Sequence, residues 1–112
     1  MMVQPKEVRL YVTAEGRCPF ENWLNGLRDR TARAAIDARI ARLRLGLVGH
    51  VREVGDGVHE LKADVGQGYR VYFGNVGATV VVLLCGGDKR GQKGDIKRAQ
   101  GFWADYKQRT KG

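Results

Sequence analysis

The chain has 112 residues, 43% of them hydrophobic, which is enough for one core and too little for two domains. Its 20 lysines and arginines outnumber 12 aspartates and glutamates, so the formal net charge is +8. A folded domain with this net positive charge favours a polyanionic partner, RNA first of all. A positive charge that serves only solubility would give the same composition.

The sequence also excludes several classes of protein. Cys18 and Cys85 are far apart, and no cysteine or histidine cluster has ligand spacing, so we predict neither a disulfide framework nor a zinc site. We expect no metal and no other cofactor. No run of roughly eighteen apolar residues is present, and the first residues lack the apolar core of a signal peptide. The expectation is a cytoplasmic protein without membrane contact.

The first half of the chain predicts one strand and two helices. Alternation of charged and apolar residues indicates a short strand over residues 7–13. Pro19 suits the first turn of a helix, and a second helix runs from Thr31 to about Leu47. Their apolar residues recur at spacings of three and four, which is typical of helices packed on one face. We expect them to form a helical hairpin.

The second half predicts strands and a last helix. Glycines separate four apolar segments at residues 50–54, 58–65, 69–75 and 79–86. A final helix is expected from Asp95, as its N-cap, to about Gln108. The order predicts a single α+β domain over residues 1–112, with an antiparallel sheet packed against the N-terminal helical hairpin.

The strand period places polar side chains together on one face of this sheet. If Leu61 and Val71 face the helices, the opposite face carries a second set of residues from the same two strands, and a three-residue turn at residues 65–67 preserves that register. That set is Glu60, Lys62, Arg70 and Tyr72. The next strand ends at two glycines and leads into a polar loop that carries Lys89, Arg90, Gln92 and Lys93. We expect the cations of this loop to lie near Arg70, and Arg90, Gln92 and Lys93 to contact RNA.

Such a cluster suits RNA cleavage in which a 2′-hydroxyl attacks the adjacent phosphate. Arg70 and Lys89 are candidates for stabilising the phosphorane, and Lys62 for a base or a second cation. Tyr72 is a candidate acid or stacking group. Tyr69 is a candidate for stacking on RNA, although it shares the face of Val71, which is typical of a core residue.

The two histidines are weaker candidates. His59 has the right chemistry for a general base, but it shares the face of Leu61, so we expect it to be packed or at a rim. His50 follows the second helix and is expected to be a cap or a surface residue.

The chain combines the motifs GYRVYF, LLCGGDK and QKGDIKRA with FENWLNGLRD upstream. This combination resembles the RelE/ParE superfamily of toxins from bacterial toxin-antitoxin modules, within it the HigB-like group, and the resemblance covers nearly the whole chain. It implies a β-α-α-β-β-β fold, here extended by a terminal helix. That helix can cover or replace part of the site, and Tyr106 lies in its packed stripe rather than where some members place a C-terminal tyrosine.

For the RelE and HigB branches the resemblance implies metal-independent cleavage of mRNA on the ribosome, with Arg70, Lys62, Lys89, Arg90 and Gln92 at matching positions. It also implies neutralisation by a cognate antitoxin, with operator DNA bound only through the toxin-antitoxin complex. The ParE branch leaves an alternative open, inhibition of DNA gyrase without nuclease activity. A non-toxic nucleic-acid-binding module is a further alternative.

Overall fold

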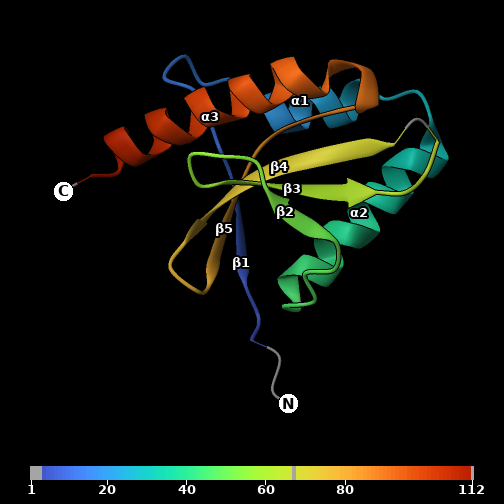
Figure 1. The fold of residues 1–112 in the computed structure, drawn as a ribbon, viewed down its shortest axis with the longest axis horizontal. Coiled ribbons are helices and arrows are strands. Elements are labelled where there is room, and N and C mark those ends of the chain that lie inside the picture. Colours follow the sequence, from blue (N-terminus) through green and yellow to red (C-terminus); the bar gives the residue numbers. More distant parts are fainter. Residues whose placement is uncertain (1–3, 67, 112) are drawn as a thin grey trace.

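In the computed structural model, which describes residues 4–66 and 68–111, a five-stranded sheet lies between two helical layers (Figure 1). The helices are α1 (Pro19–Gly26), α2 (Arg30–Arg44) and α3 (Gln92–Arg109), and a 3-10 turn, η1 (Lys89–Gly91), precedes the last of them. The strands are β1 (Glu7–Leu10), β2 (Val51–Glu53), β3 (Val58–Ala63), β4 (Tyr69–Val76) and β5 (Val80–Gly87).

The predicted helices are confirmed, but several of their ends differ, and α2 ends at Arg44 rather than near Leu47. Asp29 caps α2 by accepting a hydrogen bond from the Ala32 amide at 3.1 Å, so the helix begins at Arg30. The last helix begins at Gln92, three residues before the predicted start. Asp88 accepts hydrogen bonds from the amides of Arg90 and Gly91 and so begins the turn that leads into α3. Asp95 therefore lies inside the first turn rather than at the cap.

The sheet is mixed, which corrects the prediction of an antiparallel sheet. Its order is β1-β5-β4-β3-β2, and β1 pairs in parallel with β5 while the other three pairings are antiparallel. Parallel neighbours need a long crossover connection, which the chain between β1 and β5, α1 and α2 included, supplies. β1 is also shorter than expected and ends at Leu10, because its pairing with β5 ends at Leu83.

Each face of the sheet has its own core. On one face, residues of α1 and α2 pack on alternate residues of β3, β4 and β5: Phe20, Ala32, Ile36, Ile40, Leu43, Leu61, Ala63, Tyr69, Val71, Phe73, Val81 and Leu83. On the other face α3 contributes Ala99 and Trp103. The helices α1 and α2 therefore both cover one face, as predicted, and α3 covers part of the face on which the cations were expected.

The register of the central hairpin is confirmed. Lys62 lies opposite Arg70 and Glu60 opposite Tyr72, so the four side chains share a face. Of the predicted turn at residues 65–67, Gln67 lies outside the described residues. Within residues 4–66 and 68–111, none of the helices combines the length and the apolar character that a membrane crossing requires.

Candidate nucleic-acid interface

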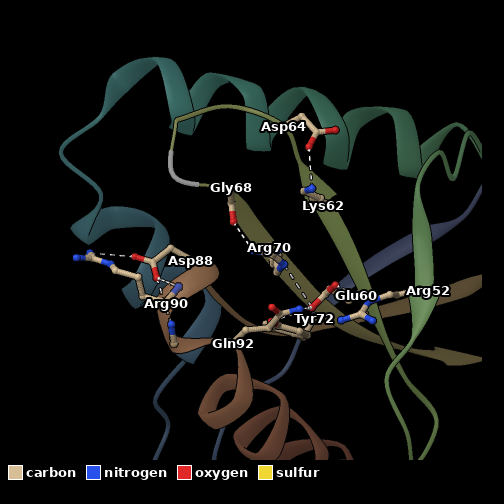
Figure 2. A network of polar contacts seen from close by, with 11 residues as sticks. Arg52, Glu60, Lys62, Asp64, Gly68, Arg70, Tyr72, Asp88, Arg90 and Gln92 are labelled. Carbon is tan, nitrogen blue, oxygen red and sulfur yellow. Dashed lines mark hydrogen bonds and ion pairs between the residues drawn. The ribbon is translucent and has the colours of Figure 1, made fainter.

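Three cations from three elements line one open pocket of about 500 Å³: Lys62 of β3, Arg70 of β4 and Lys89 of η1. A second pocket of about 300 Å³ shares Lys62 and Arg70 with the first. It adds His50, Val51, Arg52, Glu60 and Gln92 to the lining. We call the two pockets together the basic groove, whose central residues are shown in Figure 2.

Arg70 is the most deeply set of the groove's cations. Its side chain is 9% exposed, and its Nη1 donates a hydrogen bond to the Gly68 carbonyl at 2.7 Å. Gly68 adopts a φ of 76°, a conformation that favours glycine, as the chain enters β4. The buried Nε makes no hydrogen bond to any described residue, and the Glu60 carboxylate lies 3.6 Å from it. The guanidinium is thus fixed by β4 and by its counter-ion while it borders both pockets.

Glu60 is the centre of the polar network beneath the groove (Figure 2). Its carboxylate accepts hydrogen bonds from Arg52 Nε at 2.9 Å, Gln92 Nε2 at 2.8 Å and the Tyr72 hydroxyl at 3.1 Å. Burial alone would raise the pKa of Glu60, but the hydrogen bonds from Arg52 and Gln92 outweigh it and hold the pKa below its usual value. Glu60 is therefore ionised at neutral pH and balances part of the positive charge.

Lys62 and Lys89 are exposed cations at the rim of the groove. Lys62 forms an ion pair with Asp64, at 3.3 Å from Nζ to Oδ1, and both side chains are largely in solvent. Such a pair is weak and easily exchanged for a phosphate. Within the described parts of the chain, no carboxylate forms an ion pair with Lys89. These two lysines are the groups most available to an incoming anion.

The remaining predicted RNA contacts lie at different places. Gln92 turns its amide to Glu60, whereas Arg90 is largely exposed and pairs with Asp88 at 3.3 Å. Lys93 is exposed on α3 and lines neither pocket. Figure 2 shows Arg90 beside Asp88 at the left of the view, away from Lys62 at the right. The loop after β5 therefore supplies one cation, Lys89, to the groove itself.

The two tyrosines are not on the groove surface. Tyr72 is fully buried under α3, and its hydroxyl donates to Glu60. Burial, and next the negative charge of Glu60, raise the pKa of Tyr72 far above its usual value. Tyr69 packs in the other core, with its ring centroid 6.3 Å from that of Trp23. In this arrangement neither ring has a face open to an RNA base, and Tyr72 supports Glu60 instead.

His50 and Arg52 belong to the groove and were missed as site residues. The pairing of β2 with β3 places Arg52 opposite Glu60, and the His50 carbonyl accepts a bond from the Lys62 amide at 3.5 Å. The signal was present, since a hairpin between the predicted strands 50–54 and 58–65 puts both residues on the face of Lys62. His59, by contrast, stacks on Phe73 on the opposite face, as predicted.

The groove offers side chains for anions rather than for cations. Among residues 4–66 and 68–111, no group of three or more histidine, cysteine, aspartate and glutamate side chains is placed to hold a metal ion. The arrangement can bind a phosphate between Lys62, Arg70 and Lys89, and it sets an imidazole beside that position.

Comparison with known proteins finds a relative of the chain but no described family. No family model matches the chain. A protein of Haemophilus influenzae, described only as an uncharacterized protein, is 51% identical over 81 residues, which are 72% of this chain and 82% of the relative.

Proposed function

The chain belongs to the same family as this Haemophilus influenzae protein, and we propose that it is the toxin of a type II toxin-antitoxin module that cleaves mRNA on the ribosome. The proposal rests on the resemblance to the RelE/ParE superfamily and on one observation. That observation is the convergence of Lys62, Arg70 and Lys89, from three separate elements, on a single open pocket.

The three cations suit the charge that develops during phosphodiester cleavage. The 2′-hydroxyl oxygen attacks phosphorus, the bond from phosphorus to the 5′-oxygen breaks, and the products are a cyclic phosphate and a 5′-hydroxyl. Arg70 and Lys89 contact the non-bridging oxygens of the phosphorane, where donors fixed in advance stabilise the extra charge. Because Glu60 holds Arg70 in place, little reorganisation is needed at the moment of reaction.

Two proton transfers complete the reaction. Lys62 is the candidate base or a further cation, because it lines both pockets beside Arg70. His50 lines the second pocket, and histidine is the side chain whose proton exchange falls near neutral pH. We assign His50 the protonation of the leaving 5′-oxygen, the role for which Tyr72 is too deeply buried.

The shape of the groove supports dependence on the ribosome. Both pockets are shallow and open to solvent, and no ring of Tyr69 or Tyr72 reaches their surface. A groove of this kind can bind a phosphate but does not by itself orient the reacting groups of a flexible RNA. A message already positioned in the decoding site would supply that orientation.

An antitoxin partner is supported by the surface beside β1, a strand at the edge of the sheet. Leu10 and Val12 are 39% and 42% exposed there, and Leu45 after α2 is 60% exposed. An antitoxin with aliphatic and acidic residues would cover this surface and balance the net charge of +8. We expect a dissociation constant of about 10⁻⁹ M or below, and operator DNA bound only through the complex.

Cleavage of a programmed ribosome's mRNA, mapped by primer extension, tests the function. We expect truncated message only with ribosomes, and a loss of at least about a hundredfold for Arg70→Ala. Arg42→Ala, an exposed cation on α2, is the matched control and should cleave normally. An intact message with the wild-type protein would overturn the nuclease. Inhibition of gyrase supercoiling in the same preparation would then support the ParE-like alternative.

A further inference from the structure

A second cleft, separate from the basic groove, lies at the end of the sheet between α1, α3 and the loop that joins β1 to α1. It has a volume of about 560 Å³, within the range of small-molecule sites. Figure 1 shows α1 and α3 near one another at the same end of the sheet. The lining combines Trp23 of α1 with Arg98 and Phe102 of α3.

The indole of Trp23 lies directly on β5, because Gly86 has no side chain. A Cβ at Gly86 would come within 2.2 Å of the indole ring. Across the cleft, Phe102 stacks on Tyr11 with 5.0 Å between ring centroids and is fixed by that contact. Both Trp23 and Phe102 are half-buried, so each is held on one side and accessible on another. The cleft therefore offers aromatic surface at two of its walls.

Arginines accompany these rings. The Arg98 guanidinium lies 5.5 Å from the centroid of Phe102 and pairs with Asp95 at 3.4 Å, while its side chain is still 55% exposed. Arg17 is exposed in the loop on the other side. A planar ring beside a guanidinium is the combination that holds an unpaired base and its phosphate.

The floor of the cleft is an open strand edge. β1 pairs with β5 only as far as Leu83, whereas β5 continues to Gly87. In the part of the chain that the structure describes, Cys85 and Gly86 therefore have a strand partner only on the β4 side. Backbone groups of such an edge can bond the polar edge of a base. The open edge is too short for a peptide strand to add to the sheet, which disfavours a protein ligand.

We propose that this cleft binds one unpaired nucleotide of RNA, next to the phosphate that the basic groove holds. Gly87 lies opposite Arg70, and Gly86 forms the floor of the cleft, so only the end of β5 separates the two sites. This inference rests on the proposed function for the identity of the polymer. It adds a second contact that would set which nucleotide flanks the cleaved bond.

Binding of an uncleavable RNA measures the cleft without relying on catalysis. The probe is a fluorescein-labelled single-stranded 2′-O-methyl RNA of about ten nucleotides, titrated with the full-length protein and followed by anisotropy. We expect Arg98→Gln and Phe102→Leu each to raise Kd about fivefold or more, the scale of one stacked base. Arg42→Gln on α2 removes the same charge elsewhere and should change Kd less than about twofold. Urea unfolding of each variant shows whether it is folded.

Tryptophan fluorescence gives a second readout from the same titration. Trp103 is 5% exposed, so RNA in the cleft should quench Trp23, and the signal should vanish in Trp23→Phe. If Arg98→Gln and Arg42→Gln bind equally and the fluorescence does not change, the cleft is not an RNA site, even where mRNA cleavage is intact. If Arg98→Gln weakens the binding of a poly-glutamate peptide and leaves RNA binding unchanged, the cleft is a site for a protein partner and the inference is wrong. If RNA binding depends on Arg98 but the protein cleaves no mRNA, the cleft remains an RNA site and the proposed nuclease function is wrong.

Discussion

The carboxylate of Glu60 lies 3.6 Å from the Nε of Arg70, and both side chains are more than nine-tenths buried. Neither group could be buried alone, since an unpaired charge in the protein interior is strongly unfavourable. The pair therefore fixes the guanidinium at the base of the groove. Lys62 and Lys89, which have no buried counter-ion among the described residues, remain at its rim.

Replacing Glu60 by glutamine should destabilise the protein. The change keeps the size of the side chain but removes the negative charge that balances Arg70 and Arg52, and it replaces one of the two acceptor oxygens by an amide group that donates. We expect unfolding in urea at pH 7 to become easier by about 3 kcal/mol. Asp64→Asn removes an exposed ion pair to Lys62 and is the control, with an expected change below about 0.5 kcal/mol. Equal effects of the two substitutions would contradict the central role of Glu60.

Glu60 gives the stability a definite dependence on pH. Burial raises the pKa of Glu60, but the hydrogen bonds from Arg52 and Gln92 lower it by more. A carboxyl whose folded pKa is depressed stabilises the protein above its unfolded pKa of about 4.3, and that stability is lost as the pH falls through the folded value. The gap in unfolding free energy between wild type and Glu60→Gln should be constant from pH 7 to pH 5 and shrink on further acidification. Urea midpoints at pH 7, 5 and 3.5 measure it, and a gap that widens in acid would refute the assignment.

Two substitutions distinguish a residue that supports the structure of the groove from one that is proposed to act on the phosphate. Tyr72→Phe removes only the hydrogen bond to Glu60, so we expect a loss of about 1 kcal/mol in stability and cleavage on ribosomes within about threefold of wild type. Lys89→Ala should leave stability within about 0.5 kcal/mol and lower cleavage at least about tenfold. Primer extension and urea unfolding on the same preparations give both numbers. A large loss of cleavage in a stable Tyr72→Phe variant would return the proton-donor role to Tyr72.

Local signals made most of the fold predictable. The three-and-four spacing in the helices and the glycines between strands gave the elements, and the period of two placed Lys62 and Arg70 opposite each other. The pairing of β1 with β5 has no local signal, because its partners lie more than seventy residues apart. The start of α3 was misplaced because Asp88 and Asp95 are equally good caps in sequence, and only the path of the chain after Gly87 selects Asp88.

The site was predictable to the extent that it depends on the alternation of side chains between the two faces of a strand. This alternation correctly put Tyr72 on the face of Arg70, but it carries no information on what covers that face. α3 lies over Tyr72 and leaves Lys62 open, which is a matter of tertiary packing. Glu60 was predicted on the face of Lys62, Arg70 and Tyr72, but not as the centre of a hydrogen-bond network, because one of its donors, Gln92, is 32 residues away.

Gly86 should tolerate no side chain, since the indole of Trp23 occupies the place of a Cβ. Gly86→Ala would force the ring off β5, and overpacking of this kind lowers stability by about 1–3 kcal/mol. Gly101 offers the opposite case within α3, where a Cβ would meet nothing within 4 Å. Gly101→Ala should raise stability by about 0.5–1 kcal/mol, because alanine favours the helix. Urea unfolding followed by circular dichroism measures both. Stabilisation by Gly86→Ala would mean that Trp23 does not lie on the strand, and the cleft beside it would lose one of its aromatic walls.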